Sequence, residues 1–222
     1  MGMTAGQHAF TVRDTELLLE SPILAVRRDR VAMPGDTDAA REIVEHFGAV
    51  AIVALDEDGR IPLVRQYRHS VGQRLWELPA GLLDIADEDE VTCAARELKE
   101  EAGLVAGSWG VLADLVTSPG FCDEAVRVFL ARDLTEVDRP DAEHEEADLT
   151  LDWVDLGEAV SMVFRGEIVN SIAIAGIMTA NEVAAGRAEP RTVDAPFSVR
   201  PAALPARRVS AGVVPDMKKI HQ

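Results

Sequence analysis

The sequence predicts a mixed α/β fold preceded by a small β-rich unit. Residues 49–55 (AVAIVAL) form a continuous apolar run, which is typical of a strand buried on both faces. Residues 91–102 carry apolar side chains at helical spacing, and two further helices are expected at residues 156–165 and 171–185. Because strands and helices both occur between residues 49 and 190, we expect them to share one core.

The composition fits one globular domain with an appendage: the chain has 222 residues, and 47% of them are hydrophobic. The net charge of −17 argues against nucleic acid as a partner, because its phosphates require a basic surface. No apolar run is long enough to cross a bilayer, and the N-terminus lacks the features of a secretory signal. Cys93 and Cys122 are too few for a disulfide framework. We therefore expect a cytoplasmic protein without membrane contact.

Residues 1–48 are expected to form a separate β subdomain. Short alternating runs occur at residues 9–12 and 23–33, the sequence MPGD marks a turn, and residues 41–46 are a further extended stretch. At the other end of the chain, residues 191–222 are polar and rich in proline, so we expect a mobile tail there.

In the central segment, residues 56–59 (DEDG) are expected to form a hairpin turn, from which residues 61–69 return as a strand. Arg65 and Arg68 of that strand are candidates for binding phosphate, although either could instead pair with a carboxylate. The Pro119-Gly120 pair predicts a tight turn with a positive φ at the glycine. Residues 134–148 form an acidic loop. Other strands are expected at residues 76–79, 109–116, 125–131 and 149–156.

The helix at residues 90–102 carries a cluster of carboxylates. On a helical wheel Glu97 and Glu101 lie side by side, one turn apart, with Glu100 next around the helix. Like charges at these spacings repel, and near the closing Gly103 they also oppose the helix dipole. A solvated acidic face is the simple interpretation, whereas a bound Mg²⁺ or Mn²⁺ would offset the repulsion. The apolar stripe of this helix is expected at Val91, Ala94, Ala95, Leu98 and Ala102.

The glutamates of this helix, together with Arg96, Gly81 and Gly103, resemble the Nudix hydrolase box. The flanking segments RQYRHSVGQRLWELPAGLLD and TSPGFCDE resemble the ADP-ribose pyrophosphatase branch of that family. Pro119, 16 positions after Gly103, is similar to the proline of ADP-sugar enzymes. Six residues separate Gly81 from Glu88, one more than in the usual box, so either the loop has an insertion or Asp87 replaces the glutamate. The matching positions are Gly81, Glu88, Arg96, Glu97, Leu98, Glu100, Glu101, Gly103 and Leu104.

The resemblance implies a Nudix-type α/β/α sandwich around a mixed sheet, with the small N-terminal β subdomain (residues 1–48) before the Nudix hydrolase domain (residues 49–190). It implies metal-dependent hydrolysis of the diphosphate bond of ADP-ribose to AMP and ribose 5-phosphate. It also implies a homodimer in which the N-terminal sheet helps to form the substrate site of the other copy.

The resemblance also assigns roles to individual residues. Mg²⁺ or Mn²⁺ would be held by the Ala80 carbonyl, Glu97 and Glu101, with Glu100 as a third carboxylate, and Arg96 would orient these glutamates. The general base is expected in the acidic loop at Glu146, with Glu145 as the second choice and Glu100 as the candidate if neither acts. Substrate contacts are expected at Arg41, Arg68, Glu77, Ser118 and Gly120.

Two alternatives remain open at this point. The chain could be a pyrophosphatase for another nucleoside diphosphate sugar or for a dinucleotide. It could also be a non-catalytic sensor that binds ADP-ribose-like ligands through a Nudix domain. Sensors of this kind usually lose a box glutamate, whereas this chain retains Glu97, Glu100 and Glu101.

Overall fold

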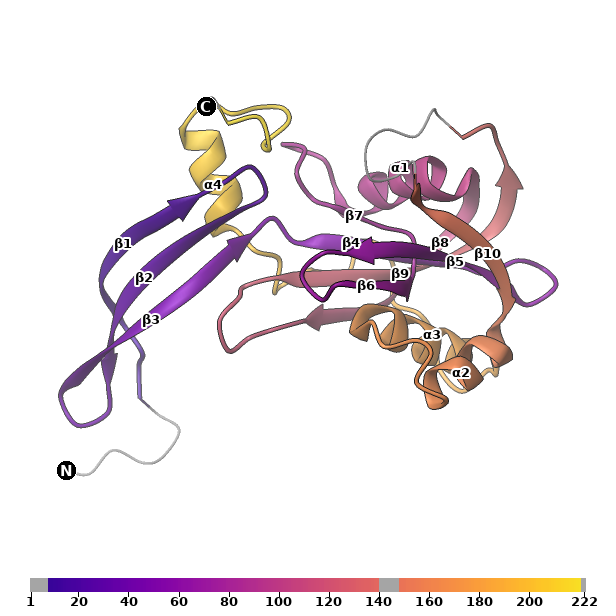
Figure 1. Ribbon diagram of the computed structural model, residues 1–222, viewed down its shortest axis with the longest axis horizontal. Coiled ribbons are helices and arrows are strands. Elements are labelled where there is room, and N and C mark those ends of the chain that lie inside the picture. The colour runs from indigo at the N-terminus through magenta and orange to yellow at the C-terminus, as the bar shows by residue number, and fades with distance from the viewer. Residues whose placement is uncertain (1–7, 140–147, 221–222) are drawn as a thin grey trace.

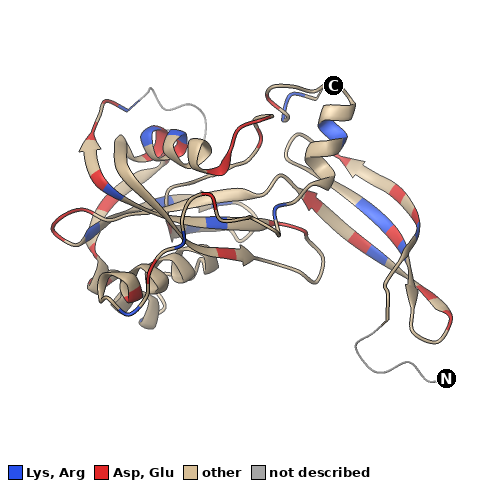
Figure 2. Cartoon of the chain, turned by 180° about the vertical axis from the view of Figure 1, so that it is seen from behind, with Lys and Arg blue, Asp and Glu red and all other residues tan. Residues whose placement is uncertain are grey.

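The computed structural model describes residues 8–139 and 148–220, and the chain begins with a separate antiparallel sheet (Figure 1). Strands β1 (Val12–Glu20), β2 (Leu24–Met33) and β3 (Thr37–His46) pair in that order. The first strand starts at Val12 and not at residue 9 as expected. Its pairing with β2 begins at Val12, opposite Val31, and continues to Glu20, opposite Ala25. Every residue of β1 is exposed. Figure 2 shows acidic and basic residues interleaved along this sheet.

The rest of the chain contains two sheets. The strand order β7-β4-β9-β8 defines a mixed sheet, in which β4 runs parallel to β9 and antiparallel to β7. The order β10-β5-β6 defines an antiparallel sheet beside it. The strands are β4 (Ala49–Ala54), β5 (Arg60–Arg68), β6 (Gln73–Glu77), β7 (Ala80–Leu82), β8 (Leu104–Val116), β9 (Ala125–Glu136) and β10 (Thr150–Asp155).

The expected hairpin between β4 and β5 is wrong. The turn itself is present, since the Asp56 N–H donates to the Arg60 carbonyl at 3.0 Å and Gly59 has a φ of +81°. However, β7 and β9 occupy the two edges of β4, so no edge is left for β5. The turn therefore leads the chain from one sheet into the other.

Helices cover both faces of the mixed sheet, so the α/β/α sandwich is confirmed (Figure 1). On one face Val50 and Ile52 of β4 pack with Leu98 in one core cluster. On the other face Ala51 and Val53 belong to a second cluster with residues of the other two helices. The three helices are α1 (Glu90–Ala102), α2 (Leu156–Phe164) and α3 (Ser171–Ala184).

The segment after residue 190 differs from the mobile tail that we expected. Arg191 pairs through its backbone with Val111 of β8, at 2.8 and 2.9 Å. Helix α4 (Ala203–Ser210) then follows, and its Leu204 is fully buried against Phe47 in a third core cluster. Arg207 forms an ion pair with Glu45 at 3.0 Å. Within the described ranges, no helix is long and apolar enough to cross a membrane.

Candidate active site

Helix α1 carries the acidic cluster, and local sequence signals set both of its ends. Asp89 is the N-cap, and its Oδ1 accepts a hydrogen bond from the Thr92 N–H at 2.8 Å. Gly103 ends the helix with a φ of 65°. The helix is rotated relative to our expectation, since Ala95 is exposed. Its buried residues are Cys93, Ala94, Glu97, Leu98 and Glu101.

Glu97 and Glu101 are buried because they lie against the backbone of β7. Each residue is only 9% exposed. The Ala80 N–H donates to Oε2 of Glu101 at 3.0 Å. Glu97 occupies the space that Gly81 leaves free, because a Cβ at this glycine would lie 1.9 Å from Cδ of Glu97. The structure therefore brings together three of the four residues that we expected to hold metal, Ala80, Glu97 and Glu101, whereas the fourth, Glu100, is more exposed.

Burial also changes the protonation of Glu97. Loss of solvent, together with the charges of Glu100 and Asp84, raises the pKa of Glu97 to about 7, against the opposite effect of Arg96. A cation would favour the charged form. Two carboxylates and a backbone carbonyl fit a hard divalent ion that keeps several waters. Among the described residues, no group of three acidic, histidine or cysteine side chains is already arranged around one metal position.

Arg96 connects the glutamates of the box. Its Nε and Nη2 donate to the two oxygens of Glu88 at 3.1 and 3.0 Å. Its Nη1 donates to Glu97 at 2.6 Å and to Glu100 at 3.2 Å. Asp87 is exposed and has a φ of 65°. Glu88 therefore makes the contact with Arg96, and the loop before it accommodates the additional residue as an insertion.

A cleft of about 560 Å³ lies beside Ala80 and Gly81. Arg68 and Glu77, both expected to contact substrate, line this cleft and form a two-point ion pair at 2.6 and 2.9 Å. Arg65 instead lies over the ring of Trp76, at 5.4 Å from its centroid. The polar and box residues of the lining are His46, Arg68, Ser70, Glu77, Ala80, Gly81, Glu124 and Asn170.

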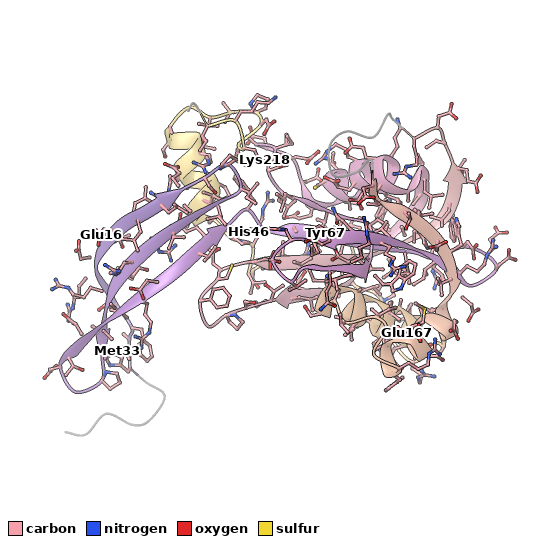
Figure 3. The ribbon with its side chains drawn as sticks, viewed as in Figure 1. Glu16, Met33, His46, Tyr67, Glu167 and Lys218 are labelled. Atoms are coloured by element: carbon pink, nitrogen blue, oxygen red, sulfur yellow. The ribbon has the colours of Figure 1, made fainter. Side chains whose placement is uncertain are left out.

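The sequence did not suggest His46, Glu124 or Asn170 as lining residues. Figure 3 shows His46 at the junction between the N-terminal sheet and the main domain. Its ring accepts the Gly48 N–H at 3.2 Å, and burial lowers its pKa, so the ring is neutral at pH 7. No local pattern marks these residues, because they meet only when separate segments of the chain pack together.

Three predicted substrate residues lie away from this cleft. Arg41 is on β3, with its guanidinium 4.0 Å from the sulfur of Met33. Figure 3 shows Met33 at the end of the N-terminal sheet farthest from His46. Ser118 and Gly120 lie in the β8–β9 loop and are absent from the lining formed by the described residues.

The expected positive φ at Gly120 is also wrong. The Ser118 carbonyl accepts the N–H groups of Phe121 and Cys122 at 3.1 and 2.9 Å, which makes a compact turn without left-handed backbone. Glu145 and Glu146, the predicted general bases, lie outside the described residues.

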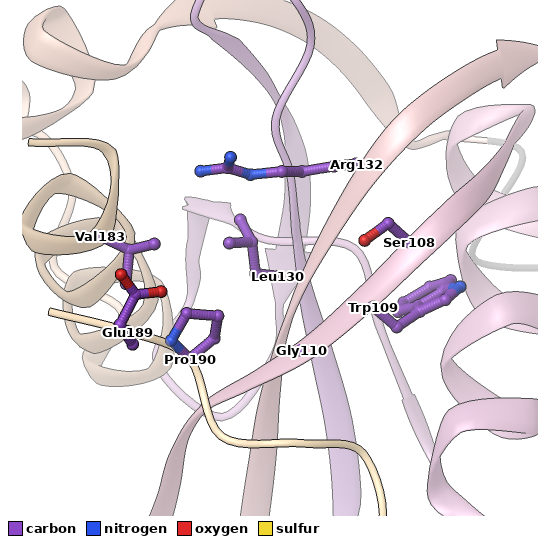
Figure 4. A pocket seen from close by; sticks show the side chains of 8 residues that line it. All are labelled: Ser108, Trp109, Gly110, Leu130, Arg132, Val183, Glu189 and Pro190. Atoms are coloured by element: carbon purple, nitrogen blue, oxygen red, sulfur yellow. The ribbon is translucent and has the colours of Figure 1, made fainter. Parts of the chain in front are cut away.

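A second cavity of about 310 Å³ lies where β8, β9 and the chain after α3 meet (Figure 4). Arg132 and Glu189 are its charged lining residues. None of the residues predicted for the active site lines this cavity.

Comparisons with known proteins agree with this geometry. Residues 45–172 match the NUDIX domain. The chain is 57% identical to ADP-ribose pyrophosphatase of Mycobacterium tuberculosis, over 91% of this chain and 98% of that protein. It is 34% identical to ADP-ribose pyrophosphatase of Bacillus subtilis, over 70% and 84% of the two chains. A crystal structure of an ADP compounds hydrolase has the same fold, with a TM-score of 0.70 and 18% identity, over 83% of this chain and 100% of that chain. This chain belongs to the Nudix hydrolase family.

Proposed function

We propose that the protein hydrolyses the diphosphate bond of ADP-ribose to AMP and ribose 5-phosphate. The observation that carries the proposal is the position of the buried carboxylates of Glu97 and Glu101 against the backbone of Ala80 and Gly81, which lines the same cleft as Arg68. The choice of ADP-ribose is supported by the identity of 57% to the mycobacterial ADP-ribose pyrophosphatase.

Nudix hydrolases generally depend on a divalent metal, and for this chain we propose Mg²⁺ or Mn²⁺. When bound, such an ion would neutralise charge on the diphosphate and would acidify the attacking water. Glu97, Glu101 and the Ala80 carbonyl would hold it, with Glu100 as a further carboxylate. Arg96 keeps these glutamates in place through its contacts with Glu97 and Glu100.

The general base is proposed to be Glu146, with Glu145 as the alternative. Two described residues flank their segment. Arg139 donates to the Glu100 carbonyl of α1 at 3.3 Å, and Asp148 forms an ion pair with Arg74 of β6 at 2.5 Å. The two contacted residues, Glu100 and Arg74, belong to α1 and β6, which border the site. This supports the proposal that the segment between Arg139 and Asp148 supplies the general base.

Arg68 is proposed to bind a phosphate oxygen, because a guanidinium matches phosphate geometry. Glu77 is 4% exposed and accepts two hydrogen bonds from this guanidinium, which fixes its orientation. Arg41, Glu77, Ser118 and Gly120 remain proposed substrate residues. Because Arg41 is on the N-terminal sheet, its role requires the partner subunit.

The same proposal includes a two-fold homodimer formed through the N-terminal sheet. Leu17, Leu18 and Leu19 of β1 are 42%, 40% and 52% exposed. An exposed apolar edge strand is a surface that proteins usually cover. A cytoplasmic enzyme without nucleic-acid or membrane partners is also proposed. The net charge of −17 argues against nucleic acid as a partner.

A substrate panel tests the choice of ADP-ribose. The protein is incubated with Mg²⁺ and ADP-ribose, ADP-glucose, another nucleoside diphosphate sugar or a dinucleoside diphosphate, and a phosphatase reports the monophosphates released. We expect kcat/KM for ADP-ribose to exceed the others by about 10-fold or more. Equal values would indicate a general nucleoside diphosphate sugar hydrolase. Binding of ADP-ribose without turnover would indicate a sensor.

A further inference from the structure

The loop between Gly81 and Glu88, which contains the insertion, pairs with the end of the chain. The Met217 N–H donates to the Asp84 carbonyl at 2.9 Å, and the Ala86 N–H donates to the Pro215 carbonyl at 2.8 Å. Ile85 and Asp216 form an antiparallel bridge between these contacts. We call residues 213–220 the C-terminal strap. Figure 1 shows this segment extending from α4 to the loop that precedes α1.

Two side chains fix the strap. Met217 is 2% exposed and packs with Phe47 and Leu204, so this end of the chain is anchored in a core cluster. Lys218 reaches the loop before α1, where its Nζ lies 2.5 Å from Oδ2 of Asp84. Among the described residues Oδ2 of Asp84 accepts no hydrogen bond, so its contact with Lys218 is an ion pair. Asp84 is 3% exposed, and within the described residues Lys218 is its only ion-pair partner.

The loop that Asp84 belongs to contacts the site at both ends. At its start Gly81 supports Glu97, and at its end Glu88 binds Arg96. Between these ends, the charge of Asp84 acts on Glu97. The middle of the loop therefore carries a buried negative charge beside a site that is already acidic, and the strap supplies the compensating positive charge.

We propose that Lys218 is a positioning residue of the active site: by neutralising Asp84 it holds the loop of residues 82–87 in the conformation on which Glu97 and the Ala80 carbonyl depend. This inference rests on the metal site of the proposed function. It gives a role to the basic end of the chain, which lies beyond the residues that match the NUDIX domain.

Removing Lys218 has two opposite effects on the affinity of the site for a metal ion, and the sign of the measured change shows which effect is larger. An uncompensated buried carboxylate is strongly unfavourable, so the loop must open to hydrate Asp84. That movement displaces Glu97 and weakens metal binding. By contrast, loss of a positive charge in a rigid site would strengthen the binding of a cation. Weaker binding therefore indicates positioning, and tighter binding indicates only charge repulsion.

The test measures the Kd for Mn²⁺ by electron paramagnetic resonance in the full-length protein. We expect Lys218→Met to raise this Kd by about 10-fold, the usual effect of losing a residue that orients metal ligands. Lys219→Met is the matched control, because the Lys219 side chain is 81% exposed and its ion pair among the described residues is with Asp216, at 3.3 Å. Its Kd should stay within about twofold of the wild-type value, as is usual for surface substitutions.

A double variant separates positioning from stability. Asp84→Asn in the Lys218→Met background removes the unpaired charge, so it should bring the Kd back to within about threefold of wild type. A lower melting temperature with an unchanged or tighter Mn²⁺ Kd in Lys218→Met would overturn the inference. A wild-type protein that binds no Mn²⁺ would overturn both the inference and the proposed metal site, whereas equal Kd values for the Lys218 and Lys219 variants would overturn the inference alone.

Discussion

The carboxyl group of Glu97 occupies space that only a glycine at position 81 leaves open. A Cβ on Gly81 would lie 1.9 Å from Cδ and 2.0 Å from Oε1 of Glu97. Because the glycine belongs to β7 and the glutamate is held by Arg96 at 2.6 Å, neither can move without disturbing the other contacts of the box. The sequence position of the glycine and the burial of the carboxylate are therefore two parts of one arrangement.

We expect Gly81→Ala to lower kcat for ADP-ribose by about 100-fold, since a displacement of about 1 Å at a reacting centre has this effect. Gly107→Ala is the control, because the nearest atom to its added Cβ would be Cβ of Asp133, at 3.1 Å, and neither residue belongs to the proposed site. The measurement is steady-state kinetics in saturating Mg²⁺. Equal kcat values for the two variants would show that the position of Glu97 does not limit turnover.

The raised pKa of Glu97, about 7, predicts a pH-dependent stability of the metal-free protein. Between about pH 4.5, where an exposed glutamate ionises, and pH 7 the folded protein binds more protons than the unfolded chain, so this group makes stability fall as pH rises. The penalty is complete above pH 7. The melting temperature of Glu97→Gln, compared with that of the wild type at the same pH, should therefore be higher at pH 8 than at pH 5.

The measurement is thermal unfolding in a chelator at the two pH values, with Glu100→Gln as the comparison, because the side chain of Glu100 is 36% exposed. We expect a difference of a few degrees between the two pH values for Glu97→Gln, since about 1 kcal/mol shifts the midpoint of a protein of this size by about 2–4 °C. A shift that is the same at both pH values would contradict the raised pKa.

The general base can be identified by amide substitutions in the acidic segment. We expect Glu146→Gln to lower kcat by about 100-fold or more, the usual contribution of a general base, with little change in metal affinity. A merely solvated position would change kcat by less than about twofold. A large loss in Glu145→Gln instead would move the role by one residue. If neither variant loses activity, Glu100 becomes the candidate.

The homodimer proposal predicts that the exposed leucines of β1 are buried between two chains. A Leu17→Asp and Leu19→Asp double variant should become a monomer and lose affinity for ADP-ribose, because Arg41 on the same sheet would no longer reach the site of the partner. Light scattering after size-exclusion chromatography gives the mass, and kinetics gives KM. Val116→Asp is the control, since this apolar residue is 46% exposed on another sheet. A fully active monomer would refute the proposal.

Local signals in the sequence predicted much of the fold. Asn170 caps α3, as its place before an apolar helix predicts, and its side chain accepts the N–H groups of Ile172 and Ala173. Gly103 ends α1, and the apolar run of β4 is buried at every position. These features depend on residues that are close in the sequence.

Features that depend on distant contacts were not predictable in this way. The helical wheel placed Ala95 inside and the glutamates beside the stripe, whereas contact with β7 turns Glu97 and Glu101 inward. Because the composition after residue 190 is mostly polar, we expected a mobile tail there. Two apolar residues, Leu204 and Met217, nevertheless anchor this segment in a core cluster. Pairing of strands far apart in the chain carries no local signature either, so β5 could not be assigned to its partner β10.

The most direct test of the account is the release of AMP from ADP-ribose, followed by chromatography, for the wild type and for Glu97→Gln and Glu101→Gln. With Mg²⁺ the wild type should produce AMP and ribose 5-phosphate in equal amounts, and a chelator should stop the reaction. Each variant should retain the fold but lose most of the activity, since an amide is a poorer ligand for a hard cation. Turnover near the wild-type rate in either variant at ordinary Mg²⁺, or wild-type turnover in the chelator, would contradict the account.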